Sequence, residues 1–337
     1  MMTKAHGGDI YTFAKNKGIG LDQVIDLSSN INPLRPMINI DFNMIDPRPY
    51  PDINYKILKK AISKHYGILS QNIALFNGAS AAIFTLMREL DGDVYLYAPL
   101  YSEYERACKL YGKSVTLINR FKTNKKEPKQ GSIVIFVNPS TPDGKYHDLE
   151  NMMQMWIDKS CTIIIDESFL EFTPFNSIYK KFAYYPKLFV LKSMTKFFSC
   201  AGIRVGVLIG EQKSIDMITK REPSWMISRG DEFYILGALK DKTFEKRTKE
   251  HFKKERKRLL KVLEKAPQIN KIYPSDVNFF MVELSQGWSA KSFAKLCAKE
   301  NILIRDCSNF DFLSDTHVRV AIKTKEETKA LKKALFA

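Results

Sequence analysis

The chain has 337 residues, and its 45% hydrophobic and 27% charged content is typical of a soluble globular protein with one large and one smaller domain. Its net charge of +16 is compatible with nucleic acid, a membrane surface or anionic substrates as partners. Residues 1–17 lack the apolar core of a signal peptide, and no apolar run approaches the roughly 20 residues that span a bilayer, so neither secretion nor membrane insertion is expected.

The cysteine and histidine patterns argue against disulfide and metal chemistry. None of the five cysteines belongs to a C-x-x-C pair or a regular framework, which predicts reduced thiols and a cytoplasmic location. The five histidines are scattered and show no metal-ligand spacing, so no metal site is predicted.

The N-terminal region contains few apolar residues. Residues 10–17 predict a short helix ended by Gly18, and residues 24–33 predict a strand that runs into an Asn/Pro turn. His6 precedes these elements, and on residue type alone it is an ordinary exposed histidine. Residues 48–52 then form a turn made rigid by two prolines, whose simplest role is to link two parts of the fold.

An anion site is predicted at the start of a later helix. Residues 55–66 have a helical pattern, residues 73–76 form a short strand, and residues 77–80 open an apolar helix at 81–90. Free backbone N–H groups at a helix start bind anions when small residues allow close approach. This pattern alone is weak, because Ser80 is also a common N-cap residue.

Two further strands end near groups that could contact a ligand. Residues 94–98 form one strand, after which the ring of Tyr101 could stack on a planar heterocycle, although packing is the default role for one of 15 tyrosines. Residues 133–137 form a strongly apolar strand, which is followed by the Asn/Pro-rich turn 138–144.

The next two strands end at residues suited to catalysis. Residues 162–165 form a buried strand with Asp166 at its carboxyl end, where a carboxylate could keep a pyridinium nitrogen protonated or cap the following turn. Residues 188–191 form another buried strand, and Lys196 lies beyond its carboxyl end, where ligands bind in open α/β sheets.

A phosphate site is predicted around Lys196. Ser193, Thr195 and Arg204 supply hydroxyl and guanidinium donors before the next apolar run, 205–209. A lysine beside a bound phosphate indicates covalent attachment of an aldehyde cofactor, namely pyridoxal phosphate.

The C-terminal third has a different composition. The segment 223–228 predicts a hinge into a smaller domain, and residues 240–265 predict a long helix with one apolar face and a basic face interleaved with glutamates. We interpret the basic face as solvated surface, with nucleic-acid binding as the alternative.

Two arginines interrupt the apolar strands of the C-terminal sheet. Residues 277–282, 302–310 and 317–322 have strand patterns, and Arg305 and Arg319 lie inside the last two. A buried guanidinium requires an anion partner, which is either a ligand or an aspartate in a structural ion pair.

These motifs together resemble a known enzyme family. The segment 192–198, Lys-Ser-Met-Thr-Lys-Phe-Phe, closely resembles the lysine segment of fold type I aminotransferase-like enzymes. It is most similar to the threonine-phosphate decarboxylase branch, a relative of histidinol-phosphate aminotransferase. The His-Gly-Gly at 6–8, the Ser-x-Asn-Ile-Asn-Pro at 28–33, the Ile-Leu-Ile-Arg-x-Cys-x-Asn-Phe at 302–310 and the Val-Arg-Val-Ala-Ile at 318–322 also resemble that branch.

Two positions differ from the wider superfamily. Phe169 stands where many aminotransferases have a tyrosine, and phenylalanine is the residue of the decarboxylase branch. Thr141 occupies the place of an asparagine that, in the family, hydrogen-bonds the 3-oxygen of the cofactor. The threonine hydroxyl can still donate a hydrogen bond, but its side chain is shorter.

The resemblance implies an α/β fold, aminotransferase fold type I, with a doubly wound, mostly parallel sheet in a large domain and a small α/β domain built from both chain ends. We expect an N-terminal arm and part of the small domain at 1–45, a large pyridoxal-phosphate-binding domain at 46–235 and a C-terminal small domain at 236–337. The resemblance also implies a homodimer in which Tyr50 reaches the cofactor phosphate of the neighbouring subunit.

The resemblance assigns roles to the residues of the cofactor site. Lys196 would hold pyridoxal 5'-phosphate covalently, with its basicity lowered by burial and nearby cations, and Asp166 and Tyr101 would complete the catalytic set. Asp166 would pair with the ring nitrogen, and Tyr101 would stack on the ring. The expected cofactor-binding residues are Tyr50, Gly78, Ala79, Ser80, Tyr101, Thr141, Asp166, Ser193, Lys196 and Arg204.

The substrate site is implied in the same way. The expected substrate-binding residues are His6, Asn30, Arg305 and Arg319. His6 and Arg305 would bind the substrate phosphate, and Arg319 would bind the substrate carboxylate or phosphate. The expected partner is therefore a phosphorylated amino acid, with no nucleic acid and no membrane.

The implied activity is decarboxylation of L-threonine O-3-phosphate to (R)-1-amino-2-propanol O-phosphate, a reaction of cobalamin biosynthesis. The first alternative is a histidinol-phosphate aminotransferase or related transaminase, which uses the same cofactor and differs in how the substrate's anionic groups are held. The second alternative, from another class, is a non-enzymatic basic protein that binds nucleic acid.

Overall fold

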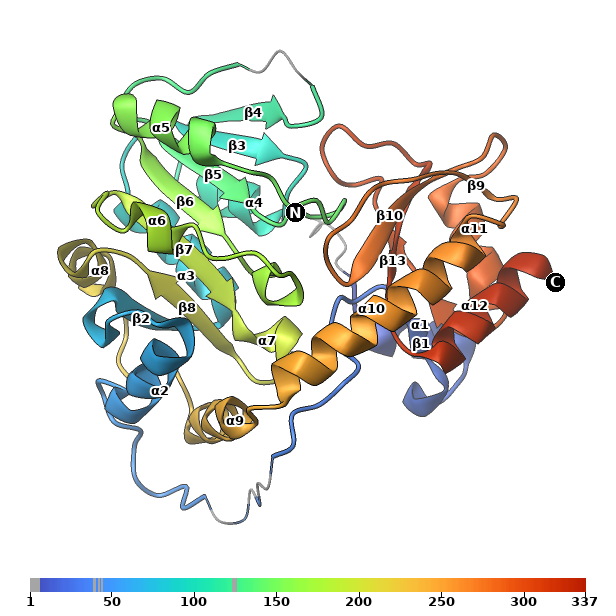
Figure 1. Cartoon of the computed structure of the whole chain (residues 1–337), viewed down its shortest axis with the longest axis horizontal. Helices are drawn as coiled ribbons and strands as arrows, with labels where there is room; N and C mark the ends of the chain where they lie inside the picture. The colour runs from blue at the N-terminus through green and yellow to red at the C-terminus, as the bar shows by residue number, and fades with distance from the viewer. Residues whose placement is uncertain (1–6, 39–40, 42, 44, 123–125) are drawn as a thin grey trace.

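The computed structural model describes residues 7–38, 41, 43, 45–122 and 126–337. Its largest sheet consists of β2 (Ile73–Asn77), β3 (Val94–Ala98), β4 (Val115–Asn119), β5 (Ile133–Val137), β6 (Thr162–Asp166), β7 (Leu188–Ser193) and β8 (Val205–Ile209). These seven strands lie in the order β2-β8-β7-β6-β5-β3-β4 (Figure 1). Neighbours pair in parallel, except that β8 is antiparallel to both β2 and β7. The expectation of a mostly parallel α/β sheet is confirmed.

Helices cover both faces of this sheet. One face packs against α3 (Gly78–Glu89), α4 (Glu103–Leu110) and α8 (Gln212–Thr219). The other face packs against α2 (Lys56–Tyr66), α5 (Glu150–Asp158), α6 (Tyr179–Phe182) and α9 (Arg229–Lys240). Because both faces are buried, the central strands are apolar at consecutive positions instead of alternating, as in the buried run of β5.

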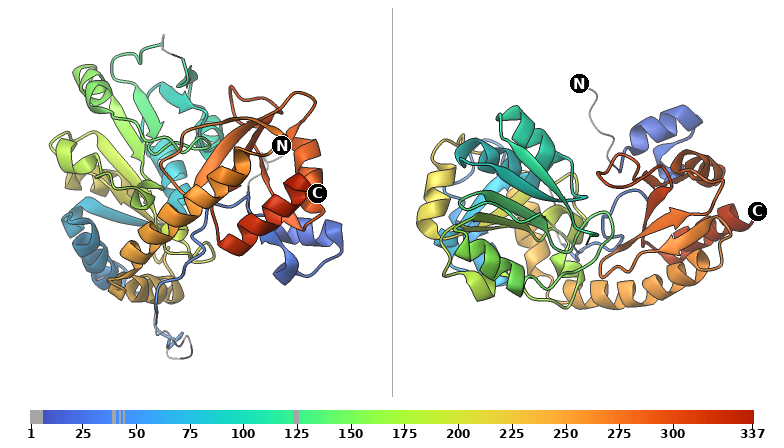
Figure 2. Two further views of the ribbon diagram at one scale, coloured as in Figure 1. Left: turned by 45° about the vertical axis from the view of Figure 1, so that its right-hand side comes forward. Right: turned by 90° about the horizontal axis from the view of Figure 1, so that it is seen from above.

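A second part of the molecule contains two smaller sheets. A four-stranded sheet has the order β12-β13-β10-β9, and β1 pairs in parallel with β11. Their bounds are β1 (Ile25–Asp26), β9 (Ile269–Ile272), β10 (Phe279–Leu284), β11 (Ile302–Leu303), β12 (Arg305–Asp306) and β13 (His317–Ala321). The helices α1 (Ile10–Lys17), α11 (Ala290–Ala298) and α12 (Lys325–Phe336) lie beside these strands (Figure 2). Both ends of the chain therefore build this part, while the domain boundaries at 46 and 236 stay a prediction.

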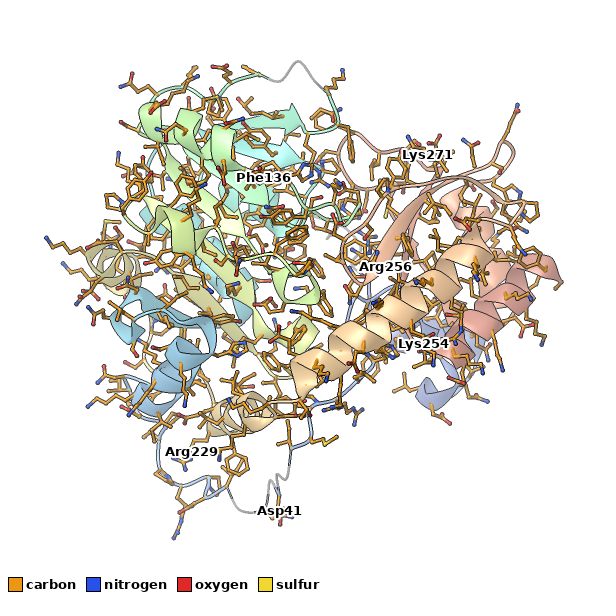
Figure 3. All side chains as sticks on the ribbon, viewed as in Figure 1. Asp41, Phe136, Arg229, Lys254, Arg256 and Lys271 are labelled. Carbon is orange, nitrogen blue, oxygen red and sulfur yellow. The ribbon has the colours of Figure 1, made fainter. Side chains whose placement is uncertain are left out.

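One long helix, α10 (Phe244–Leu263), runs from the large sheet to the smaller ones (Figure 1). Its apolar side is buried as predicted, at Phe244, Phe252, Leu259 and Leu263. Its basic side is more varied: Lys254 is exposed, whereas the guanidinium of Arg256 donates to the Ser275 carbonyl at 2.5 Å (Figure 3).

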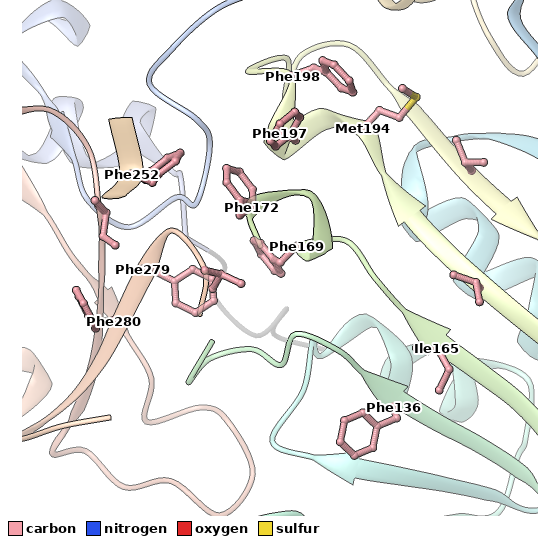
Figure 4. Close-up of a cluster of buried hydrophobic side chains, with 14 of the residues drawn as sticks. Phe136, Ile165, Phe169, Phe172, Met194, Phe197, Phe198, Phe252, Phe279 and Phe280 are labelled. Atoms are coloured by element: carbon pink, nitrogen blue, oxygen red, sulfur yellow. The ribbon is translucent and has the colours of Figure 1, made fainter. Parts of the chain in front are cut away.

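Aromatic side chains join the two parts next to α10. The Phe172 ring lies 5.3 Å from the Phe252 ring of α10 and 5.3 Å from the Phe197 ring (Figure 4). Phe197 belongs to α7 (Met194–Phe197), and Phe172 to the 3-10 helix η4 (Leu170–Phe172). Phe169 also packs edge-on against Phe279 of β10, with centroids 5.2 Å apart. These contacts pack the segment after β6 against β10 and α10.

Local predictions differ from the structure mainly at element ends. The helix at 10–17 has the predicted bounds, and Gly18 ends it with φ 66°. The helix predicted at 81–90 begins at Gly78, so Ser80 lies in its first turn and is not the N-cap. The helix predicted at 240–265 begins only at Phe244, because α9 ends at Lys240. The strand predicted at 277–282 is β10, which begins at Phe279.

Other elements carried no prediction. The strands β4 and β9 are partly exposed and lack a continuous apolar run. Two further 3-10 helices with described bounds are η1 (Leu21–Gln23) and η3 (Ser70–Asn72). Among the described residues, no helix is both long and apolar enough to cross a membrane.

Candidate active site

A cavity of about 260 Å³ lies between the large sheet and the second part of the molecule, at the carboxyl ends of β5, β6 and β7. Eleven predicted site residues line it: Asn30, Ala79, Ser80, Tyr101, Thr141, Asp166, Ser193, Lys196, Arg204, Arg305 and Arg319. Among its described lining residues, four are basic and Asp166 is the one acid. The cavity is therefore built to accept a ligand with several negative charges.

Lys196 lies in α7, directly after β7. Its Nζ is 3.3 Å from the Ser193 hydroxyl, to which it donates, and 5.2 Å from the centroid of the Phe169 ring. Burial lowers the pKa of Lys196, and the charges of Arg204 and Arg319 lower it further, against the opposing effect of Asp166. A lowered pKa makes more of the neutral amine available, which is the form that reacts with an aldehyde.

Asp166 is the last residue of β6 and is buried. Its Oδ2 accepts a hydrogen bond from the Tyr104 hydroxyl at 2.8 Å, and its Oδ1 accepts one from the Ser168 N–H at 2.9 Å. Two donors to one carboxylate fix its orientation. Asp166 can therefore act as a fixed anion at the floor of the cavity. Burial and the Asp166 charge raise the pKa of Tyr104 well above its ordinary value, so this hydroxyl stays a donor.

The predicted anion site forms at the start of α3. The first turn of this helix includes Ala79 and Ser80, whose backbone N–H groups have no partner within the helix. Gly78 has φ 77°, and a Cβ at this position would collide with the Arg204 guanidinium, so only glycine allows that approach. The Ser80 hydroxyl lies 3.3 Å from the Tyr101 hydroxyl, which brings the Tyr101 ring to the same wall.

The opposite side of this anion site comes from the turn after β7. The hydroxyls of Ser193 and Thr195 are 2.9 Å apart. Arg204 is held from behind, because its backbone N–H donates to Asp231 at 2.9 Å and its Nη1 donates to the Ala201 carbonyl at 2.9 Å. The hydroxyls, the guanidinium and the α3 N-terminus thus line one end of the cavity, a donor set suited to a phosphate group.

Two arginines enter the cavity from the four-stranded sheet. Arg305 of β12 and Arg319 of β13 are directly paired across the two strands, and they are 7% and 8% exposed. Arg305 donates to the Asp306 carbonyl at 2.5 Å and to Asn309 Oδ1 at 2.9 Å. Neither guanidinium forms an ion pair with a carboxylate among the residues described here. The structural ion pair considered for these arginines is therefore not formed within that part of the chain.

Two adjacent buried cations without acidic partners are costly unless a ligand supplies the charge. Burial lowers the pKa of Arg305, and it lowers the pKa of Arg319 to about 10, so both guanidinium groups remain charged at neutral pH. The Nε of Arg319 also lacks a hydrogen-bond partner within the described chain. These groups favour a ligand with two anionic groups, or one dianion, at this end of the cavity.

Thr141 lines the cavity, and its side chain contacts the second sheet. Its hydroxyl accepts a hydrogen bond from Arg319 Nη1 at 3.1 Å. Its carbonyl accepts one at 3.0 Å from Arg120, which forms a buried ion pair with Asp143. The side chain is therefore engaged with the arginine of the second sheet.

The remaining predicted residues are placed differently. Asn30 lines the cavity, and its buried Oδ1 has no hydrogen-bond partner among the described residues. His6 lies outside the described residues. Tyr50 is 74% exposed, stacks on Trp225 with ring centroids 4.5 Å apart, and does not line the cavity of its own chain.

Sequence reasoning missed Tyr104, Arg120 and Ser168, which contact site residues. Their only signal was a polar side chain near a strand end, and many other residues share that signal. Among the described residues, no cluster of three or more potential ligand side chains could hold a metal ion.

Comparison with known proteins relates this chain to one enzyme family. The model of the family "Aminotransferase class I and II" matches residues 22–335. The chain is 32% identical to a provisionally named threonine-phosphate decarboxylase of Caldanaerobacter subterraneus subsp. tengcongensis, over 98% of this chain and 92% of that protein. It is 29% identical to the adenosylcobalamin biosynthesis bifunctional protein CobDQ of Leptospira interrogans, over 97% of this chain but only 40% of that protein.

A solved structure from the related aminotransferase branch is equally similar. The histidinol-phosphate aminotransferase of Clostridium acetobutylicum superposes with a TM-score of 0.84 and 33% sequence identity, covering 93% of this chain and 98% of that one. The chain is therefore about equally similar to a relative named as a decarboxylase and to one named as an aminotransferase.

Proposed function

The chain belongs to the class I and II aminotransferase family of pyridoxal-phosphate-dependent enzymes, and on that premise we propose that it decarboxylates L-threonine O-3-phosphate. The observation that carries the proposal is the pair of buried arginines, Arg305 and Arg319, which face a lysine of lowered pKa without carboxylate partners among the described residues. A substrate with one phosphate and one carboxylate would supply both missing anions.

The residues of the large sheet fit the cofactor. Lys196 would bind its aldehyde through Nζ, and Asp166, held by two donors, would pair with the ring nitrogen. Tyr101 would stack on the ring. The phosphate would lie at the start of α3, where Gly78 leaves room for the Arg204 guanidinium. The bound cofactor supplies an electron sink for the electron pair released when a bond at the substrate's Cα breaks.

The residues of the second part would hold the substrate. Arg305 would bind the phosphate, together with His6, and Arg319 would bind the carboxylate. The unpartnered amide oxygen of Asn30 would accept a hydrogen bond from the substrate. Which bond at Cα breaks depends on which bond stands perpendicular to the cofactor ring, so these anchors would determine whether carbon dioxide or a proton is lost. Lys196 Nζ, or water, would then return a proton to Cα.

A homodimer with shared sites completes the proposal. Tyr50 and Trp225 form an exposed stacked aromatic pair, and contiguous exposed apolar surface marks interaction sites. The neighbouring subunit would cover them, and Tyr50 would there reach the cofactor phosphate. All five cysteines are buried free thiols, which fits a reducing compartment such as the cytoplasm.

A histidinol-phosphate aminotransferase is the second candidate, favoured by the solved structure at 33% identity. It would use the same cofactor groups, and it would bind an amine that carries a phosphate but no carboxylate. In that case one of the two arginines would serve the carboxylate of the second substrate, 2-oxoglutarate.

Product analysis distinguishes the two candidates. Purified enzyme with L-threonine O-3-phosphate should release carbon dioxide and (R)-1-amino-2-propanol O-phosphate without 2-oxoglutarate. Lys196→Ala should release none and should lack the absorbance of the bound cofactor, whereas Lys180→Ala, which changes an exposed lysine of α6, should match the wild type. Amino transfer from histidinol phosphate to 2-oxoglutarate, without carbon dioxide release from threonine phosphate, would refute the decarboxylase and support the second candidate.

A further inference from the structure

The hydrogen bond between Thr141 and Arg319 joins the two parts of the molecule inside the cavity. Thr141 lies in the turn after β5 of the large sheet, and Arg319 lies on β13 of the four-stranded sheet. The hydroxyl oxygen and Nη1 are 3.1 Å apart, and both side chains are more than nine-tenths buried. The other terminal nitrogen of Arg319 donates to the Ser28 carbonyl at 2.9 Å.

The position of Thr141 is set from behind, by the large sheet. Arg120 follows β4, donates to the Thr141 carbonyl at 3.0 Å and forms a buried ion pair with Asp143. The Ser140 hydroxyl also donates to Asp143, at 2.6 Å. The Thr141 hydroxyl is thus a fixed acceptor, and the long arginine side chain is the group whose orientation it determines.

The start of the same turn is fixed as well. The Asn138 side chain donates to the His147 carbonyl at 2.9 Å and accepts from the His147 N–H at 2.9 Å. A turn anchored at both ends keeps the threonine in place whether or not a ligand is bound.

The geometry of Arg319 leaves part of it free for a ligand. A guanidinium has five N–H donors, of which Thr141 and Ser28 occupy two. Nε and the remaining hydrogens of the terminal nitrogens have no partner among the described residues, and the group lies 5.0 Å over the Phe279 ring. The guanidinium is therefore held from two sides, with an open edge that can bind a carboxylate or phosphate.

We propose that Thr141 is a positioning residue: its hydroxyl orients Arg319 and thereby sets the affinity for the anionic group of the substrate. This inference rests on the proposed role of Arg319 in substrate binding. The contact that the resemblance implies, between this residue and the 3-oxygen of the cofactor, is a separate expectation, because a hydroxyl that accepts from Arg319 can still donate. The hydroxyl accepts from a cation, so a side chain of equal shape without an acceptor leaves the guanidinium with the Ser28 carbonyl as its one hydrogen-bond acceptor among the described residues.

Steady-state kinetics of carbon dioxide release tests the role of Thr141. Thr141→Val should raise KM for L-threonine O-3-phosphate roughly two- to tenfold, because the substrate then has to order an arginine side chain that Thr141 no longer holds. The kcat should stay that of the wild type, and the holoenzyme should keep the absorbance of the bound cofactor. Thr141→Ser should restore KM. Thr85→Val is the matched control, because it removes a hydroxyl bound to the charged Glu222 outside the cavity, and it should leave KM unchanged.

Two results would overturn the inference. One is a Thr141→Val enzyme with unchanged KM, and the other is a Thr141→Val enzyme that loses the absorbance of the bound cofactor, which would assign the hydroxyl to holding the cofactor. A wild-type enzyme that releases no carbon dioxide would instead refute the proposed function. In that case the Kd of the holoenzyme for inorganic phosphate, measured by calorimetry, replaces KM. A roughly two- to tenfold weakening in Thr141→Val supports the role, and an equal Kd overturns it.

Discussion

Asn32 offers a sharp test of how the lysine-bearing turn is held. Its side chain is 1% exposed, and Nδ2 donates both to the Phe197 carbonyl at 2.9 Å and to the Thr248 hydroxyl at 3.0 Å. Oδ1 accepts from the Leu34 N–H at 3.0 Å, and the Asn32 backbone N–H donates to the Lys196 carbonyl at 3.0 Å. One residue thus ties the N-terminal segment to α7 and α10.

The loss of folding free energy in Asn32→Ala can be worked out from the groups that lose a hydrogen-bond partner. The Phe197 carbonyl remains buried and unpaired, at about 1–3 kcal/mol, and the partly buried Leu34 N–H adds about 1 kcal/mol. The Thr248 hydroxyl can rotate to a carbonyl of its own helix, so it adds little. The backbone bond to Lys196 survives the substitution. We therefore expect the free energy of unfolding to fall by about 2–4 kcal/mol.

Urea unfolding at one fixed cofactor concentration measures this loss, because a ligand that binds the folded state shifts the apparent stability. Asn54→Ala is the matched control, since Asn54 is exposed, and its change should stay within about 0.5 kcal/mol. In the Asn32→Ala background, Thr248→Val should cost less than it does alone, because its partner is already gone. A loss below about 0.5 kcal/mol for Asn32→Ala, with an unchanged m-value, would refute the reasoning.

Three further outcomes follow from the cavity. Arg305→Ala should raise KM for L-threonine O-3-phosphate at least tenfold, because the substrate loses hydrogen bonds to a charged group, and the absorbance of the bound cofactor should stay unchanged. Steady-state kinetics of Arg106→Ala, which changes an exposed arginine, is the control. Mixed dimers of inactive Lys196→Ala and Tyr50→Ala subunits should recover activity, because one of their two sites then has both native residues; no recovery would contradict a Tyr50 shared between subunits. The folded-state pKa of Lys196 is lowered, so between that pKa and the ordinary lysine pKa the unfolded chain binds one more proton than the folded protein. The free energy of unfolding of the cofactor-free protein should therefore rise with pH across this window. Urea midpoints measured across the window should rise less steeply in Lys196→Met, which lacks the titrating amine.

The parts of the site that belong to one strand and its following turn could be predicted from sequence. Asp166 and Lys196 each follow an apolar run, and these runs are β6 and β7. Local pattern is sufficient there, because burial on both faces requires consecutive apolar residues and a ligand site lies where they end. The reversed direction of β8 left no such signal, because an antiparallel central strand is as apolar as a parallel one.

The contacts that orient these groups could not be predicted, because they join residues far apart in the chain. Tyr104 and Asp166 are 62 residues apart, and Thr141 and Arg319 are 178 apart. No local pattern distinguishes Tyr104 from the other 14 tyrosines. The family motif around Thr141 implied a contact with the cofactor and carried no sign of the further contact with Arg319.

The division of the cavity between two sheets explains why relatives of two activities match this chain about equally well. The lysine, the aspartate and the anion site come from the large sheet, and their proposed task, to hold the cofactor, is common to decarboxylation and amino transfer. The paired arginines come from the four-stranded sheet, where the proposed substrate anchors lie. A motif around Lys196 therefore carries little information on which bond breaks. The discriminating positions should instead be those that orient Arg305 and Arg319, and these act through contacts such as the one from Thr141, which join segments that no single motif spans.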